Sequence, residues 1–342
     1  MNDSASFATS ESARQAAETF RSTFERIRSE VGRMMVGQAD IIDGVLTALL
    51  AGGHVLLEGV PGLGKTMLVS SLGKVVDLSF SRIQFTPDMM PADVRGSSVL
   101  VDDGAGGHSL QFEQGPIVAN LVLADEINRA TPKTQSAMLE AMQERQVSVG
   151  RRTIKLEEPF CVMATQNPVE QEGTYPLPEA QLDRFLFKLV VGYPQESDYK
   201  SILARTTGQE EVSLKKVSGA AEILEMRRTA RAVPVPEHVQ DYAVRLVMGT
   251  QPGSSYAPEI VNRSVSLGSS PRGAQALILA GKVRALVSGR FAVAQEDIDA
   301  VAKPVLRHRM LLGFQAQSEG VSTDDLVAAV QSQLSAKAGA RG

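Results

Sequence analysis

The sequence predicts a parallel α/β domain followed by a domain built of helices. Three observations support this fold class. Short apolar runs alternate with helical segments between residues 54 and 191, and a glycine-rich motif at residues 59–66 lies between the first run and a helix. After Tyr193 and Pro194, strand patterns give way to helical ones. Strands that alternate with helices favour a parallel sheet covered on both faces.

The elements of the first half follow in order. Residues 1 to about 17 are rich in Ser, Ala, Thr and Glu, so we expect a loose tail there. A charged helix is predicted over residues 18–33, and the apolar stretch 41–50 predicts a second helix that ends at Gly52 and Gly53. Strands of a parallel five-stranded sheet are predicted at residues 54–58, 81–85, 121–124, 160–165 and 187–191.

Two hairpins are predicted to interrupt the α/β alternation. The first covers residues 97–112 with a glycine-rich turn at 103–107, and the second covers residues 147–156 with a turn at Gly150 and Arg151. Beyond Pro194, helices are predicted at residues 222–231, 237–248, 272–287 and 295–309, with a last one beginning near 322–325. We therefore expect three parts: residues 1–33, an α/β domain at 34–194, and a helical domain at 195–342.

Composition excludes several classes of protein. The chain has 342 residues, of which 43% are hydrophobic and 22% charged, as in ordinary globular proteins. No apolar run approaches the ~20 residues of a membrane span, and no secretory signal is visible, so we expect a cytoplasmic protein. The net charge of −4 disfavours a generic nucleic-acid coat. The single cysteine, Cys161, is expected to be a reduced core thiol, and His54 a structural histidine.

The strongest functional signal is the glycine-rich motif at residues 59–66. It reads Gly-Val-Pro-Gly-Leu-Gly-Lys-Thr and fits G-x-x-x-x-G-K-[ST] after a strand and before a helix. The glycines let backbone amides approach phosphate oxygens, and the helix N-terminus adds positive potential. Lys65 is expected to reach the β- and γ-phosphates of a nucleotide, and the Thr66 hydroxyl to hold Mg²⁺.

Polar side chains are predicted at the ends of two further strands. Asp125 and Glu126 follow an apolar strand, at the edge where ligands of open α/β sheets bind. Asp125 is expected to hold Mg²⁺ and Glu126 to polarise the attacking water. Asn167 follows the next strand and could orient water or contact the γ-phosphate, although an ordinary Asn-Pro turn is the alternative.

Two arginines are further candidates for contact with phosphate. Arg184 precedes the last strand and could stabilise charge on the transferred phosphoryl group, or else be a surface residue paired with Asp183. Arg272 opens a helix in the second domain and could address nucleotide, or be an ordinary first-turn arginine. The locally basic set Arg145, Arg151, Arg152 and Lys155 is either functional or a solvated hairpin face.

Together these motifs resemble AAA+ ATPases, and in particular the MoxR family of the helix-2-insert group. The resemblance covers roughly residues 30–315, and its most characteristic run is Ala-Asp-Glu-Ile-Asn-Arg-Ala at 124–130. It implies that residues 59–66 are Walker A, Asp125 and Glu126 Walker B, Asn167 sensor 1, Arg184 the arginine finger and Arg272 sensor 2. The implied catalytic residues are Lys65, Glu126, Asn167 and Arg184, and the implied metal ligands Thr66 and Asp125. The implied nucleotide contacts are Gly37, Gln38, Gly59, Pro61, Gly62, Leu63, Gly64, Lys65, Thr66, Met67 and Arg272.

The resemblance also implies an activity and partners. It implies Mg²⁺-dependent ATP hydrolysis by a ring, usually a hexamer, in which Arg184 acts on the neighbour's nucleotide; whether Arg272 acts in cis or in trans stays open. The clients implied are proteins, often with von Willebrand factor A domains, remodelled in a chaperone-like way. Two alternatives remain: a magnesium-chelatase-like motor for metal insertion, with the same motor residues, and a DNA-linked motor, which the net charge of −4 disfavours.

Overall fold

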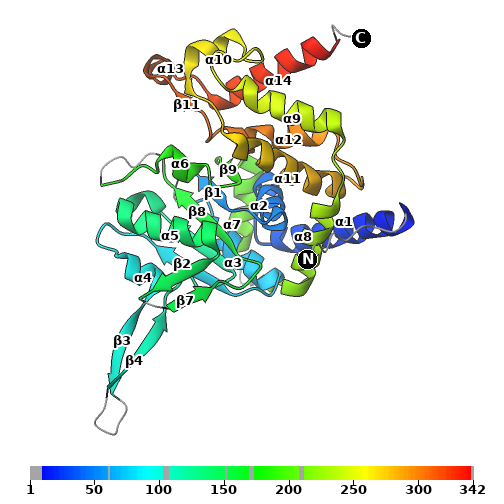
Figure 1. Cartoon of the computed structure of the whole chain (residues 1–342). Helices are drawn as coiled ribbons and strands as arrows, with labels where there is room; N and C mark the ends of the chain where they lie inside the picture. Colours follow the sequence, from blue (N-terminus) through cyan, green and yellow to red (C-terminus); the bar gives the residue numbers. More distant parts are fainter. Residues whose placement is uncertain are drawn as a thin grey trace.

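The computed structural model contains the predicted parallel sheet. It describes residues 10–60, 62–102, 108–150, 152–168, 173–207 and 212–339. Five parallel strands lie in the order β2-β5-β8-β1-β9, with helices on both faces (Figure 1). Their bounds are β1 Val55–Glu58, β2 Phe80–Gln84, β5 Leu121–Asp125, β8 Cys161–Gln166 and β9 Phe187–Val190. Each predicted strand is found within a residue or so of its expected ends.

The middle of the sheet is almost wholly apolar. β5 is buried along its whole length, as is β8 up to Thr165, because both strands have neighbours on each side and helices on each face. The strands run parallel, so the carboxyl ends of β1, β5 and β8 meet at one edge of the sheet. The residues that follow these three strands therefore share that edge, which is called the carboxyl edge below.

The helices up to residue 206 are α1 Ser10–Gly32, α2 Ala39–Ala51, α3 Lys65–Val75, α4 Pro91–Arg95, α5 Pro132–Glu144, α6 Glu179–Leu182 and α7 Glu196–Thr206. Among them, α2 packs on β9 and α3 packs on β2 and β5. The expected loose tail up to about residue 17 is wrong for residues 10–17, which belong to α1. Ala13, Ala17, Phe20 and Phe24 recur at helical spacing and are buried, so this apolar stripe outweighs the polar composition. Residues 1–9 lie outside the described residues.

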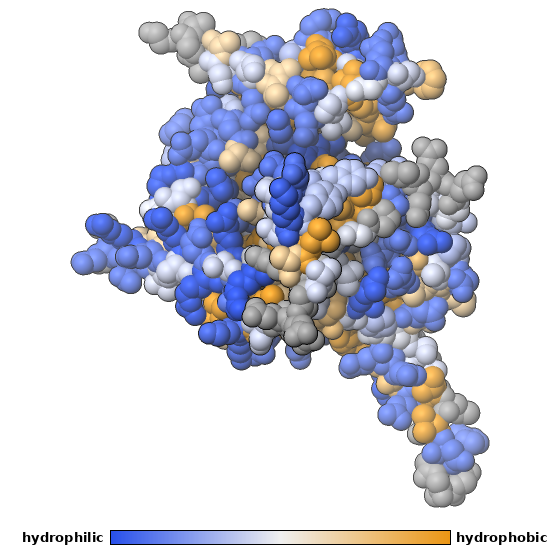
Figure 2. Space-filling model, turned by 180° about the vertical axis from the view of Figure 1, so that it is seen from behind, coloured by the Kyte–Doolittle hydropathy of each residue, from blue (hydrophilic) through white to orange (hydrophobic). Residues whose placement is uncertain are grey.

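Both hairpins are present. The first consists of β3 Gly96–Asp102 and β4 His108–Gln114, and the second of β6 Gln146–Val149 and β7 Arg152–Lys155. The first hairpin projects far from the body, and Figure 2 shows apolar side chains along it. Val99 and Val101 are among these exposed residues. The predicted turn at 103–107, and Arg151 of the second hairpin, lie outside the described residues.

The second half is helical apart from one short ladder. Its helices are α8 Ala220–Ala232, α9 Glu237–Gly249, α10 Glu259–Ser264, α11 Pro271–Val287, α12 Gln295–Leu306, α13 Phe314–Ser318 and α14 Thr323–Gly339. β10 Val265–Leu267 pairs with β11 Leu311–Leu312, which the sequence analysis did not predict. Among the helices of the described residues, none has the length and apolar character needed to cross a membrane.

One hydrophobic core joins the sheet to the helical half. Buried residues of α1, α2, α3 and α11 belong to a single cluster that also includes strand residues such as Leu57 and Phe187. α1 and α2 both pack against α11, and α8 packs against α2. A second cluster, around α5 and Phe160, covers the other face of the sheet. The helical half is therefore fixed to the sheet by continuous packing.

Candidate functional site

The glycine-rich motif forms a loop between β1 and α3. Gly59 donates its N–H to the carbonyl of Gln166 (3.2 Å), which fixes the start of the loop beside the end of β8. A Cβ at Gly59 would come within 2.7 Å of the Val191 carbonyl oxygen. Gly62 and Gly64 have φ of +83° and +78°, the left-handed region that favours glycine. Pro61 lies outside the described residues. Since α3 begins at Lys65, the free N–H groups of its first turn face the loop.

Lys65 and Thr66 open α3 at the carboxyl edge. The Lys65 ammonium donates to the carbonyl of Gly59 (2.5 Å) and more weakly to that of Val60 (3.4 Å). Burial lowers the pKa of Lys65, while the attraction of Asp125 and Glu126 opposes that shift. The lysine and the two carboxylates therefore belong to one electrostatic site, although residues 59–66 and 125–126 are far apart in sequence.

The loop at Gly37 and Gln38 supports the glycine-rich motif from the side. The Gln38 amide donates to the carbonyl of Leu63 (3.0 Å). Gly37 has φ of +71°, and a Cβ there would overlap the Asp198 carboxylate of α7. Met67 of α3 is partly exposed beside the motif. Gly37 and Gln38 thus connect the loop to α7.

Asp125 and Glu126 are held by a residue of the neighbouring strand. Thr165 of β8 donates its hydroxyl to Asp125 Oδ1 (2.7 Å) and accepts the N–H of Glu126 (2.8 Å). Arg82 of β2 donates to Asp125 Oδ2 from Nε (3.1 Å) and from Nη2 (2.5 Å). The carboxylate of Asp125 is therefore fixed from both neighbouring strands.

Glu126 has an unusual backbone. Its φ is +56°, a left-handed conformation that costs a non-glycine residue on the order of 1–3 kcal/mol. The conformation turns the chain from β5 into the short 3₁₀ helix Ile127–Arg129, and Arg129 Nη1 lies 3.1 Å from Glu126 Oε2. Such strain is typical of functional sites, where surrounding contacts maintain it.

Asn167 completes the group at the carboxyl edge. It follows β8 directly and is only 6% exposed, next to the Gln166 carbonyl that accepts the Gly59 N–H. The structure therefore brings together Gly59, Lys65, Asp125, Glu126 and Asn167, as the sequence predicted for residues that follow parallel strands. Backbone amides and Lys65 suit a polyphosphate, and the oxygens of Thr66 and Asp125 are the ligand type that Mg²⁺ prefers. A magnesium nucleotide fits these residues.

Arg184 lies at the opposite edge of the sheet. The N–H of Leu186 binds the carbonyl of His54, which precedes β1, and Arg184 donates to the carbonyl of Leu139 (2.8 Å). The four residues of β1 span about 13 Å, so this amino edge is a full strand length away from Gly59. The structure thus does not place Arg184 in the same site as Lys65.

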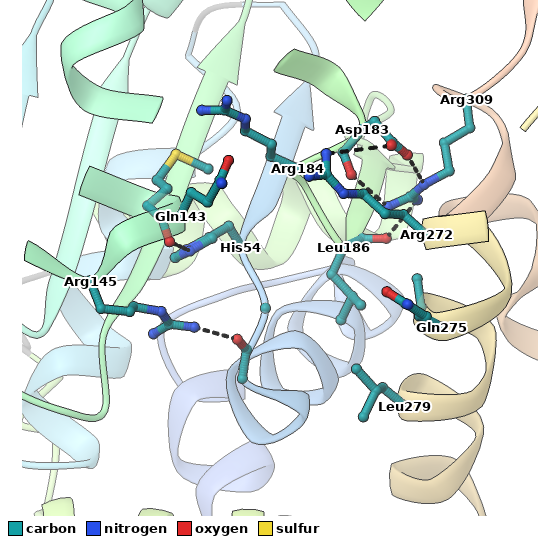
Figure 3. A pocket seen from close by; sticks show the side chains of 14 residues that line it. His54, Gln143, Arg145, Asp183, Arg184, Leu186, Arg272, Gln275, Leu279 and Arg309 are labelled. Carbon is teal, nitrogen blue, oxygen red and sulfur yellow. Dashed lines mark hydrogen bonds and ion pairs between the residues drawn. The ribbon is translucent and has the colours of Figure 1, made fainter. Parts of the chain in front are cut away.

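Arg272 also lies near the amino edge, in a pocket of about 270 Å³ where the helical half meets the sheet (Figure 3). The pocket is lined by four arginines, Arg145, Arg184, Arg272 and Arg309. Asp183 accepts from Arg309 Nε (2.9 Å) and from the Ser270 hydroxyl (2.8 Å), and lies 3.6 Å from Arg272 Nη1. Arg184 extends away from this cluster (Figure 3). Asp183 therefore pairs with Arg309 and Arg272 and not with Arg184, which was the alternative interpretation of Arg184.

Several of these contacts were missed in the sequence analysis. Arg82, Thr165, Arg129 and Arg309 each bind a predicted site residue or its neighbour. A weak signal existed for Arg82 and Thr165, because polar residues that interrupt a strand beside a site often face it. Arg309 gave no signal, since its contact with Asp183 joins two distant segments.

Two other predictions concerned structural residues, and both are confirmed. His54 is buried, accepts the N–H of Val162 at Nδ1 (2.9 Å) and donates from Nε2 to the carbonyl of Met142 (3.1 Å). Burial lowers its pKa to about 3, and the nearby Arg145 adds to the shift. Cys161 is a buried free thiol whose pKa burial raises to about 11.

The basic set on the second hairpin is split by the structure. Arg145 donates to the carbonyls of Gly52 (2.7 Å) and Phe160 (2.9 Å), and pairs with Glu158. It therefore stabilises the fold beside the amino edge. Arg152 and Lys155 are exposed on β7.

Comparison with known proteins agrees with this geometry. Residues 54–187 match the model of the ATPase family associated with various cellular activities (AAA), and residues 257–330 match that of an AAA lid domain. Chaperone MoxR1 of Mycobacterium tuberculosis is 44% identical over 305 residues, which cover 89% of this chain and 80% of the relative. Protein MoxR of Methylorubrum extorquens is 31% identical over 86% of this chain and 89% of its own length. The crystal structure of a putative ATPase from Cytophaga hutchinsonii superposes with a TM-score of 0.87 at 39% identity, covering 94% of this chain and 97% of that one.

Proposed function

Because the chain belongs to the MoxR family of AAA ATPases, we propose that it hydrolyses ATP with Mg²⁺ in a head-to-tail ring and uses the hydrolysis to remodel protein clients. In this proposal residues 34–194 bind the nucleotide and residues 195–342 form the lid, with residues 1–33 preceding them. The similarity to a relative named as a chaperone supports the chaperone-like role.

The carboxyl edge supplies the residues for this chemistry. The amides of the 59–66 loop and Lys65 would bind the phosphates, and Thr66 and Asp125 would hold Mg²⁺, which supplies charge neutralisation on the phosphates when bound. Glu126 would polarise the attacking water and Asn167 would orient it. Thr165 supports this assignment, because it fixes both the Asp125 carboxylate and the Glu126 backbone.

One observation supports the proposal of a ring: the phosphate-binding loop and Arg184 lie at opposite edges of the sheet. An arginine at the amino edge is out of reach of its own loop but can complete the site of a neighbouring copy. Arg272 lies beside it, close to Asp183, so we propose that both arginines act in trans. A contact between two different faces is heterologous and closes into a ring when the rotation allows it. We take the ring to be a hexamer from the family resemblance.

Mixing two inactive variants tests the trans arrangement. An arginine supplied by a neighbour is worth roughly 10³–10⁵ in rate in well-studied NTPases, so Arg184→Ala should bind ATP and be nearly inactive. Lys65→Ala should bind ATP poorly. A mixture should regain activity, because some interfaces pair an intact loop with an intact arginine. If no ratio of the two exceeds the sum of the separate activities, Arg184 does not act in trans.

The client is proposed from the family resemblance alone. We propose a cytoplasmic partner with a von Willebrand factor A domain. Affinity purification with Glu126→Gln, which should hold ATP without turnover, tests this by identifying the bound proteins. Recovery of a tetrapyrrole-metallating enzyme instead would favour the chelatase-like alternative, and ATPase stimulation by DNA would favour the DNA-linked one.

A further inference from the structure

α7 presents an apolar face to solvent beside the phosphate-binding loop. Tyr199 is 48% exposed and Leu203 58%, and both share one side of the helix with Glu196 because the three are spaced by three and four residues. Asp198 of the same helix packs against Gly37, and the adjacent Gln38 binds the loop at Leu63. The exposed face is therefore tied to the nucleotide side of the subunit.

The lid has a matching groove. It has a volume of about 690 Å³ and lies between the end of α8, α9 and α11. Val235, Val244, Ile278 and Leu279 contribute apolar surface. Val244 is 49% exposed and lies in this groove, on the face of α9 opposite the buried Val239, Tyr242 and Leu246.

One end of this groove is basic. Arg231 and Lys282 line it, and Lys282 donates to the carbonyl of Arg231 (2.8 Å). Burial lowers the pKa of Lys282, and the charge of Arg231 adds to the effect. A carboxylate placed at this end would be attracted by both groups.

The groove continues from the arginine pocket. Gln275 and Leu279 line both, and Arg272 lies in the first turn of the helix that carries them. Lys282 follows Arg272 by ten residues, or about 15 Å along α11. Suppose that the phosphate-binding loop of one subunit meets Arg184 and Arg272 of the next. The groove of that next subunit then lies against the surface beside the loop of the first subunit.

We propose that α7 of one subunit docks in the lid groove of the next. Tyr199 and Leu203 would fill the apolar part, and Glu196 would meet Arg231 and Lys282. The spacing fits helix-in-groove recognition, in which residues of one helical face enter a hydrophobic groove. Glu196 is paired with Lys200 in the same helix, but both side chains are largely exposed. Breaking this ion pair so that Glu196 can bind Arg231 and Lys282 therefore costs little free energy. This inference rests on the proposed head-to-tail assembly and names the surfaces that hold it together.

Disulfide trapping tests the docking directly. Cys161 is buried with a raised pKa, so it stays unreactive and the natural chain can serve as background. Leu203→Cys with Val244→Cys should give a ladder of cross-linked oligomers under mild oxidation with ATP present. Leu203→Cys with Phe314→Cys is the control, since Phe314 is 87% exposed and lies on α13, outside the groove. The control pair should give no ladder.

A charge exchange supplies the second measurement. Glu196→Lys and Arg231→Glu should each raise the protein concentration for half-assembly about tenfold or more, and the double variant should recover part of the loss. The proposal fails if the 203–244 pair gives no ladder while mixed Arg184→Ala and Lys65→Ala regain activity; failure of both experiments would reject the ring itself. It also fails if Leu203→Cys alone forms dimers, or if Val244→Glu keeps assembly and loses only client binding.

Discussion

Asp183 connects the segment before β9 to the lid, so its removal should weaken the attachment of the lid. Its carboxylate binds Arg309, which is only 3% exposed, and also the hydroxyl of Ser270 at the start of α11. Arg309 makes further hydrogen bonds to the carbonyls of Phe185 and Leu186. Burial lowers the pKa of Arg309 to about 10, and Asp183 opposes that shift. Asp183→Ala would leave this guanidinium buried without its counter-charge.

The expected loss is large for a single substitution. Removing one partner of a buried ion pair costs about 3–5 kcal/mol, because the remaining charge keeps its desolvation penalty. At about 2 °C per kcal/mol for a chain of this size, Tm should fall by about 6–10 °C. Asp183→Asn keeps one acceptor, which can serve Arg309, while its amide N–H would face the Ser270 hydroxyl, so it should lose about half as much.

Thermal unfolding followed by circular dichroism measures the change. Asp241→Ala is the matched control, because Asp241 pairs with Arg245 on the exposed side of α9 and such pairs contribute about 0–1 kcal/mol. Equal shifts for Asp183→Ala and Asp241→Ala would refute the reasoning. That result would mean that the hydrogen bonds to backbone carbonyls alone hold Arg309, and that the Asp183–Arg309 ion pair contributes nothing to the attachment of the lid to the sheet.

Three further outcomes are expected. Glu126→Gln should keep ATP affinity and lower kcat by about 10²–10⁴, the usual contribution of a general base, as measured by nucleotide binding and phosphate release; a parallel loss of affinity contradicts this role. The neutral ring of His54 accepts the N–H of Val162, so a second ring proton would break that hydrogen bond. The pKa of His54 is about 3 in the folded protein against 6.5 in the unfolded chain. The neutral ring therefore stabilises the folded state fully above pH 6.5, and this stabilisation is lost as pH falls, by about 1 kcal/mol at pH 5.5. Urea unfolding at pH 7.5 and 5.5 should show this loss, which His54→Gln should reduce and the exposed His238→Gln should not. If Arg151, Arg152 and Lys155 line the central channel of the ring, replacing all three with Ala should spare basal ATP hydrolysis and abolish client remodelling. A flatter salt dependence of DNA binding would instead indicate a nucleic-acid contact, and no effect in either assay a solvated face.

The sheet and the carboxyl-edge site could be predicted because their signals are local. A buried strand such as β5 is a continuous apolar run, and the residue that follows it must lie at the sheet edge. The order of strands and helices alone was therefore enough to predict that Lys65, Asp125 and Asn167 lie close together. The glycine-rich loop needs positive φ at Gly62 and Gly64, which its composition indicates.

Contacts between distant segments could not be predicted in the same way. The pair Asp183–Arg309 depends on how the lid packs on the sheet, and no periodicity reports that angle. The side of the sheet that Arg272 would face was likewise undetermined, since its position follows from the packing of α11 on α1 and α2. The start of α1 was placed too late because composition was weighed above the spacing of Ala13 and Ala17.

The shared core has a consequence for synthesis. Phe20, Phe24 and Ile27 of α1 belong to the same buried cluster as α11, yet α1 ends at Gly32 and α11 begins at Pro271. At about 5–20 residues per second, a ribosome needs on the order of 10–50 s to make the intervening chain. During that interval the aromatic side chains of α1 lack part of their final cover, and any nascent chain released before α11 emerges exposes an apolar stripe. Truncations that end before Pro271 should therefore aggregate.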